Sequence, residues 1–196
     1  MTATTGTVLP GRAPGLHLSP KGRAQADAIA TRVSGLRRLS AVYTSPMERA
    51  RETAAPVARA LRLTARVEVG LNECDFGEWT GRRLRELART PEWKTVQRYP
   101  SGFRFPGGES FPQMQTRMAA ALAGLVTRHP GEAIVAVSHG DPIKAAVALA
   151  LGTPLDLFQR IVIAPASITA VAYGASGPTV LAVNSLGGDL SRLGAR

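Results

Sequence analysis

The stretch Ala133-Ile-Val-Ala-Val-Ser-His-Gly-Asp141 joins a continuous apolar run to a short polar segment. Five apolar residues without alternation are typical of a strand that is buried on both faces of a parallel sheet. The apolar pattern resumes in the next residues and predicts a helix over Pro142–Leu151. His139 is therefore expected at the carboxyl end of a strand, which is where open α/β sheets bind their ligands.

The rest of the chain alternates strands and helices in the same way. Helices are predicted after the Ser-Pro pairs at residues 19–20 and 45–46, ending near Gly35 and Leu61. Further helices are predicted near Arg82–Arg89 and over Pro112–Arg128. The predicted strands are Leu39–Thr44, Arg66–Val69, Ile161–Ile163, Ser167–Tyr173 and Thr179–Asn184, the last two forming a hairpin. This alternation indicates an α/β fold, with helices on both faces of a mostly parallel sheet.

Length and composition narrow the class of protein. The 196 residues favour a single domain over residues 1–196, and 44% hydrophobic with 19% charged residues excludes a mainly disordered chain. No apolar stretch reaches the roughly 18 residues of a membrane span, and the first residues do not resemble a secretory signal. One cysteine, Cys74, excludes an internal disulfide framework and a multi-cysteine zinc site. We therefore expect a cytoplasmic protein.

The charge points to an anionic partner. Lysine and arginine number 24 against 14 acidic residues, a net charge of +10, and all but Lys21, Lys94 and Lys144 are arginine. Nucleic acid, an acidic membrane surface and a phosphorylated substrate are the candidate partners. A compositional bias toward arginine explains the surplus equally well. Because the arginines are scattered and not interleaved with aromatic residues, nucleic acid is the weakest candidate.

Three residues carry the candidate chemistry. His139 and Gly140 open a helix, where backbone N–H groups attract anions and a histidine can donate to a phosphate oxygen. Arg49 follows the strand over Leu39–Thr44, and its planar guanidinium can bind a phosphate with two hydrogen bonds. Glu73 lies in a loop that also carries apolar side chains, and a desolvated carboxyl with a raised pKa serves as a general acid.

The remaining candidates are weaker. The glycines of Pro106-Gly-Gly-Glu-Ser110 allow the backbone to approach a ligand, but an ordinary turn explains them equally well, and the Gly-Lys-Ser/Thr signature of a Walker loop is absent. We place Arg12, Gly108, Glu109 and Ser110 at the substrate rim. His17 and His129 are interpreted as structural or solvated, and acidic neighbours argue against a reactive Cys74 thiolate. No spacing of His, Cys and carboxylates suggests a metal, so no metal site and no cofactor is expected.

Taken together, these segments resemble the histidine phosphatase superfamily, whose fold is phosphoglycerate mutase-like. Five motifs occur in the expected order: Leu18-Ser-Pro-Lys-Gly22 with Gln25-Ala26, Ser45-Pro-Met-Glu-Arg-Ala-Arg-Glu-Thr-Ala54, Leu71-Asn-Glu73 with Phe76-Gly-Glu-Trp-Thr-Gly81, Pro106-Gly-Gly-Glu-Ser110 with Arg117, and Val137-Ser-His-Gly140. The resemblance implies a three-layer sandwich and a metal-independent phosphomonoesterase that acts through a phosphohistidine. It also implies that Arg49 and His139 bind the phosphoryl group of a small-molecule substrate and that Glu73 exchanges protons.

The sequence departs from the family at its start. The family's nucleophilic histidine belongs to an Arg-His-Gly or Arg-His-Ala motif that ends its first strand, and Met1-Thr2 aligns directly after it. We therefore expect the first strand to be missing and this chain to be inactive. Either the natural start lies upstream of Met1, or the chain is degenerate.

Two alternatives stay open beside the phosphatase interpretation. One is a pseudoenzyme that binds phosphate ligands, and the other is phosphotransfer of the phosphoglycerate mutase type. The mutases of glycolysis tend to be longer, which favours the phosphatase. The oligomeric state is left open, with a homodimer as the common default.

Overall fold

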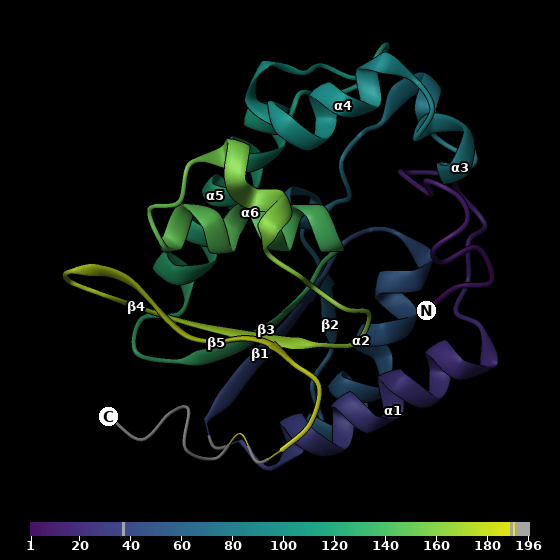
Figure 1. The fold of residues 1–196 in the computed structure, drawn as a ribbon. Helices are drawn as coiled ribbons and strands as arrows, with labels where there is room; N and C mark the ends of the chain where they lie inside the picture. Colours follow the sequence, from purple (N-terminus) through teal and green to yellow (C-terminus); the bar gives the residue numbers. More distant parts are fainter. Residues whose placement is uncertain (37, 189, 191–196) are drawn as a thin grey trace.

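Three parallel strands form the centre of the fold, in the order β2-β1-β3 (Figure 1). The computed structural model describes residues 1–36, 38–188 and 190. Strand β1 (Leu39–Thr44) lies between β2 (Ala65–Val67) and β3 (Ala133–Val137). Thr44 is in register with the last residue of both neighbours, Val67 and Val137. The carboxyl ends of the three strands are therefore level, and the segments that follow them meet at one edge of the sheet.

Helices cover both faces of this sheet. Because side chains alternate along a strand, β1 sends Val42 to one face and Ala41 and Tyr43 to the other. Val42 packs with α1 (Pro20–Ser34) and α2 (Glu48–Leu61). The opposite face packs against α5 (Phe111–Arg128), beside which lies α6 (Gly140–Ala150). Figure 1 shows these two layers on either side of the strands. The predicted α/β class with helices on both faces is confirmed.

A second apolar cluster lies beyond the carboxyl edge of the sheet. It takes buried residues from the short helices α3 (Leu84–Leu87) and α4 (Pro91–Arg98) and from the 3-10 turns η2 (Gly77–Trp79) and η4 (Leu155–Arg160). Two further 3-10 turns contribute no residue to it: η1 (Val69–Leu71), whose Leu71 packs with the α5 face of the sheet, and η3 (Pro100–Gly102). Trp79 and Phe105 are buried there and pack edge to face, 5.4 Å between ring centroids. The sequence did not predict α4. Its apolar pattern reduces to Trp93 and Val96, which is too short for a helical periodicity to show.

The carboxyl-terminal part of the chain forms the predicted hairpin. Strands β4 (Ile168–Gly174) and β5 (Gly177–Ser185) pair antiparallel with each other. The predicted strand over Ile161–Ile163 is wrong, because these residues follow η4 without regular structure. Ile161 packs against the aromatic cluster instead, so a tertiary contact outweighs the preference of β-branched residues for strands.

Strand β3 is less buried than its sequence indicates. Ala133 and Ala136 are exposed and the other three residues are half-buried, so the expected burial on both faces is wrong. The strand pairs with β1 along one edge, and within the described part of the chain no strand pairs with its other edge. An edge strand keeps some of its surface open even where its sequence is apolar.

No helix within residues 1–36, 38–188 and 190 combines the length and apolarity needed to cross a membrane.

Candidate active site

The level strand ends bring the three main candidate residues together. Ser45 and Arg49 follow β1, with Arg49 in the first turn of α2. His139 follows β3, as the residue that precedes α6. Glu73 lies in the loop after η1, the turn that follows β2. Three segments that are far apart in the sequence, each following a different strand, therefore meet at one edge of the sheet.

Glu73 lies between a guanidinium and an imidazole. Its Oε2 atom is 3.9 Å from Arg49 Nη2 and 3.8 Å from His139 Nδ1. The residues Glu73, Arg49 and His139 are 8%, 8% and 7% exposed. Interactions between charges in such a place are screened far less than on the surface.

Burial sets the protonation of two of these groups. It raises the pKa of Glu73 to about 8, and the nearby charge of Asp141 adds to this, against the opposing effect of the Cys74 N–H and Arg49. Burial also lowers the pKa of His139 well below its ordinary value, and Arg49 lowers it further. At neutral pH the site therefore holds a protonated carboxyl beside a neutral imidazole, which is the state of a general acid before reaction.

Ser45 determines which nitrogen of His139 carries the proton. The Ser45 hydroxyl donates to Asn72 Oδ1 over 3.3 Å, and its oxygen lies 2.7 Å from His139 Nε2. Because the one hydroxyl proton is used toward Asn72, the oxygen accepts from Nε2–H. The Nδ1 atom is then the basic nitrogen, and it faces Glu73. The Ser45-Pro46 pair predicts that a helix begins at Ser45, but the N-cap position of α2 is Met47.

Arg49 has a buried donor group without a partner. Its Nη2 donates to the carbonyl oxygen of Gly11 over 2.8 Å. Its Nη1 is buried and makes no hydrogen bond within the described residues. An unpaired buried guanidinium N–H is costly, so such groups call for an explanation, and an anionic ligand supplies one.

A second layer of ion pairs holds the Glu73 loop. Arg117 donates to both oxygens of Glu109, over 2.8 and 2.9 Å, and to the carbonyl oxygens of Gly70 and Asn72. Arg12 Nη2 lies 2.9 Å from Glu109, and its Nε donates to the carbonyl oxygen of Glu73. Partial burial raises the pKa of Glu109, but the hydrogen bonds from Arg117 outweigh this and the net pKa is lowered.

Two glycines let the Glu73 loop and the Glu109 loop touch through their backbones. The Glu109 N–H donates to the Asp75 carbonyl, and the Glu78 N–H donates to the Pro106 carbonyl, over 2.8 and 2.9 Å. A Cβ atom on Gly77 would overlap the Pro106 carbonyl oxygen, and one on Gly108 would overlap that of Asp75. Gly77 also has a positive φ of 49°, which favours glycine.

The predicted rim residues thus lie beside the site, each in a defined setting. Arg12 and Glu109 belong to the ion-pair layer, and Gly108 to the contact between the loops. Ser110 caps α5 by accepting from the Gln113 N–H, and Gly140 is the first residue of α6. Whether these residues touch a substrate stays a prediction.

Sequence reasoning missed the roles of Asn72 and Arg117, both of which were quoted only within motifs. Asn72 Oδ1 accepts from Ser45 and from the Glu73 N–H, so it orients two site residues. Arg117 lies in the middle of α5, where a single arginine normally indicates a solvated face. The Gly-Glu-Ser segment eight residues earlier was the available signal, because it positions Glu109 opposite Arg117.

The other histidines and the cysteine lie outside this arrangement. His17 pairs with Glu52, and His129 with Tyr43 and Glu132. Burial raises the pKa of the Cys74 thiol, and Glu73 and Glu109 raise it further. The described residues contain no cluster of three or more His, Cys, Asp or Glu side chains positioned to hold a metal ion.

The arrangement is that of an α/β protein with a buried Arg–Glu–His cluster at the carboxyl edge of a parallel sheet. The family model of the histidine phosphatase superfamily (branch 1) matches residues 2–186. The chain therefore belongs to the histidine phosphatase superfamily, as its motifs predicted.

Individual relatives cover the chain to different extents. A bifunctional protein of Mycobacterium tuberculosis is 34% identical over 172 residues, which are 87% of this chain and 47% of that protein. The chain thus spans about half the length of the curated relatives it matches first. A probable phosphoglycerate mutase of Cronobacter sakazakii is 32% identical over 183 residues, 91% of this chain and 84% of that protein.

A solved structure shows the same fold. A mutant phosphoserine phosphatase from Entamoeba histolytica, in complex with phosphoserine, superposes with a TM-score of 0.84 at 26% identity. The match covers 94% of this chain and 92% of that one. The phosphoglycerate mutase-like fold is confirmed.

Proposed function

We propose that this chain is the phosphate-ester site of a metal-independent phosphomonoesterase that works through a phosphohistidine. The observation that carries the proposal is the buried cluster of Arg49, Glu73 and His139, with one guanidinium N–H of Arg49 left for an anion. The family membership supports phosphoryl chemistry. A phosphorylated small molecule is the expected substrate.

Each residue has a role that its environment supports. Arg49 holds the phosphoryl oxygens through Nη1, and its charge offsets the negative charge of the transition state. His139 donates its Nε2–H, which Ser45 accepts in the free protein, to another phosphoryl oxygen. Glu73 gives its proton to the leaving alkoxide as the P–O bond breaks, and then takes a proton from the water that attacks the phosphohistidine.

The nucleophile is the open part of this proposal. The route forms a P–N bond to a histidine other than His139. The sequence has three histidines, and His17 and His129 are held elsewhere. We therefore propose that the 196-residue chain turns over phosphate esters very slowly or not at all. No strand within the described residues pairs with the outer edge of β3, which supports a further strand there; in the family this strand ends in Arg-His-Gly or Arg-His-Ala.

The test compares the 196-residue chain with the same chain extended by the in-frame codons upstream of Met1. With 4-nitrophenyl phosphate as substrate, we expect turnover and an acid-labile phosphohistidine in the extended chain, and neither in the 196-residue chain. Glu73→Gln in the extended chain should lower kcat by about 100- to 10,000-fold for an alkyl ester such as glycerol 2-phosphate, because its alkoxide leaving group needs a proton. Unchanged turnover in that variant would sink the general-acid role of Glu73.

A binding-only protein is the second candidate, because His139 is the one histidine at the site among the described residues. It uses the same Arg49 and His139 contacts without phosphoryl transfer. Binding of inorganic phosphate by both chains, with no phosphohistidine in either, would favour it. Phosphotransfer of the mutase type, suggested by the Cronobacter sakazakii relative, requires transfer between two positions of phosphoglycerate, and the absence of that transfer would exclude it.

A further inference from the structure

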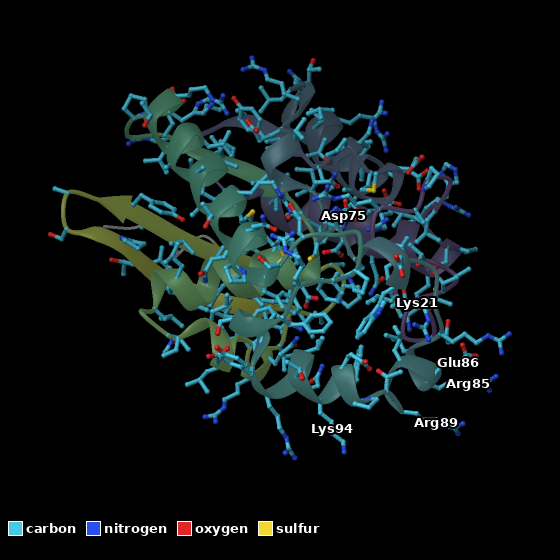
Figure 2. The ribbon with its side chains drawn as sticks, turned by 90° about the horizontal axis from the view of Figure 1, so that it is seen from above. Lys21, Asp75, Arg85, Glu86, Arg89 and Lys94 are labelled. Carbon is cyan, nitrogen blue, oxygen red and sulfur yellow. The ribbon has the colours of Figure 1, made fainter. Side chains whose placement is uncertain are left out.

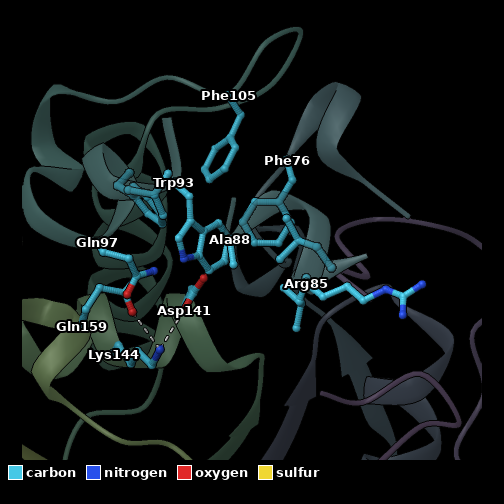
Figure 3. A pocket seen from close by; sticks show the side chains of 13 residues that line it. Phe76, Arg85, Ala88, Trp93, Gln97, Phe105, Asp141, Lys144 and Gln159 are labelled. Atoms are coloured by element: carbon cyan, nitrogen blue, oxygen red, sulfur yellow. Dashed lines mark hydrogen bonds and ion pairs between the residues drawn. The ribbon is translucent and has the colours of Figure 1, made fainter. Parts of the chain in front are cut away.

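A cavity of about 570 Å³ lies beneath α3 and α4, next to the candidate site (Figure 3). Its lining is mainly apolar and includes the aromatic residues Phe76, Trp93, Phe105 and Phe111. The three phenylalanines are only 1–3% exposed, so Trp93 and Ala88 present more of the open apolar surface. Figure 2 shows charged side chains of this segment extending to the outside of the molecule, among them Glu86 of α3, Arg89 between the two helices and Lys94 of α4. The inner side of these helices therefore offers an apolar surface while the outer side is charged.

The cavity is lined by residues that lie close in sequence to His139 and Glu73. Asp141, in the first turn of α6, lines the cavity and is two residues from His139. Its negative charge raises the pKa of Glu73. Phe76 lines the cavity from the loop that carries Glu73. A phosphate ester held by Arg49 and His139, with its bridging oxygen at Glu73, has this cavity beside its alcohol portion.

Two of the three charged residues that line the cavity, Asp141 and Lys144, pair with each other. Lys144 Nζ lies 3.1 Å from Asp141 Oδ1 and 3.2 Å from Gln159 Oε1. Arg85 is exposed, and Figure 3 shows its guanidinium extending away from the aromatic rings. A charged leaving group would lose water here without gaining an unpaired counter-ion, which is costly.

The uncharged side chains that line the cavity favour an apolar, uncharged ligand. Aromatic side chains bind flat apolar groups well, through buried area and through ring stacking. Trp93 is half-buried, and its ring stacks on that of Trp79 at an interplanar angle of 23°, so its position is fixed. The amide groups of Gln97 and Gln159 border the cavity and provide uncharged hydrogen-bonding groups.

We propose that the aromatic cavity binds the alcohol portion of the substrate, and that this portion is a flat, uncharged and mainly apolar group. The inference rests on the proposed function, because the phosphoryl group must bind at Arg49 and His139. It separates this chain from enzymes for small charged esters. The aromatic cavity has room for an alcohol portion with two fused rings, whereas the serine of a phosphoserine or the glycerate of a phosphoglycerate would leave it largely empty.

The test is binding by calorimetry to the 196-residue chain, with three probes. Inorganic phosphate reports on the phosphoryl site alone, 1-naphthyl phosphate adds a flat apolar group, and O-phosphoserine adds a small charged one. Trp93→Ala removes a wall of the cavity, and Ala88→Trp fills it from an exposed position that lines it. Tyr99→Ala is the matched control, because Tyr99 is an exposed aromatic residue nearby that does not line the cavity.

We expect 1-naphthyl phosphate to bind at least about tenfold more tightly than O-phosphoserine. Both cavity variants should remove this preference and leave the affinity for inorganic phosphate within about twofold, while Tyr99→Ala changes nothing. If inorganic phosphate binds but the naphthyl ester has no advantage, or keeps it in both cavity variants, the inference is overturned and the phosphatase proposal stands. If none of the three probes binds, Arg49 and His139 do not form a phosphate site in this chain and the inference is overturned, while turnover by the extended chain still decides the phosphatase proposal.

Discussion

The protonation of Glu73 can be tested through protein stability, without any assay of turnover. The perturbation is Glu73→Gln, which keeps the shape of the side chain. The amide oxygen can still accept from the Cys74 N–H, as Glu73 Oε1 does over 3.0 Å, and the amide N–H faces His139 Nδ1. The variant therefore removes the titration of Glu73 and little else.

The sign follows from proton binding. Burial raises the pKa of Glu73 from an ordinary value of 4.5 to about 8. Between these values the unfolded carboxyl is ionised and the folded one is protonated, so the folded state binds more protons and stability falls as the pH rises. Below pH 4.5 and above pH 8, the contribution of Glu73 to the free energy of unfolding no longer changes with pH. At about 1.36 kcal/mol for each pH unit, the loss across the whole window is about 5 kcal/mol.

The measurement is urea unfolding of wild type and Glu73→Gln between pH 6.5 and pH 9. Unfolded histidine still titrates at the lower end of this range, but wild type and the variant share this titration, so it cancels in the comparison. We expect the wild-type free energy of unfolding to fall by about 2 kcal/mol more than that of the variant up to pH 8, and then to run parallel. Glu78→Gln, an exposed glutamate of the same loop, is the control and should follow wild type. Parallel curves for wild type and Glu73→Gln throughout would refute the raised pKa.

Four further predictions concern neighbouring residues. Because burial lowers the pKa of His139, this histidine should contribute less stability as the pH falls below about 6.5, in the direction opposite to Glu73; between pH 7 and 5, His139→Gln should therefore gain stability relative to wild type, measured by urea unfolding. Arg49→Met should weaken inorganic phosphate binding by about 10- to 100-fold in calorimetry, and an unchanged affinity would remove Arg49 from the phosphoryl site. Glu109→Gln should lower the free energy of unfolding by about 1–3 kcal/mol, since it weakens the fork with Arg117, and a value near zero would show the ion pair to be incidental. Gly77→Ala should cost about 2–4 kcal/mol in the same measurement, because its Cβ overlaps the Pro106 carbonyl and its φ is positive, and a neutral result would contradict the close contact of the loops.

The fold was predictable where apolar runs are bounded by clear turns. Strand β3 was placed at its correct bounds because five apolar residues end abruptly at Ser138. The helix over Pro20–Ser34 was found because a serine cap and a proline mark its start. Burial was less predictable, because the exposure of Ala136 depends on which strands pair, and apolar patterning carries no information about pairing at the far edge.

The residues of the candidate site could be predicted from the sequence, but the hydrogen bonds that join them could not. His139 and Arg49 were identified because each follows a strand, and ligands of open α/β sheets bind beyond the carboxyl ends of the strands. The hydrogen bond between His139 and Ser45 joins residues 94 positions apart, and no local signal distinguishes it from a helix cap. The role of Arg117 was hidden for the same reason, since its partner Glu109 and the carbonyls that it binds belong to other segments.

The glycines at 77 and 108 also shape how this protein can diverge. They fasten the two loops that carry Glu73 and Glu109 so closely that neither loop tolerates a side chain at the contact. Helices α3 and α4 carry no such constraint, and they and the residues between them supply Trp93 and Ala88 to the cavity wall. Mutations that retarget the protein to a new ester should therefore accumulate in 84–98, while the reaction chemistry is inherited intact.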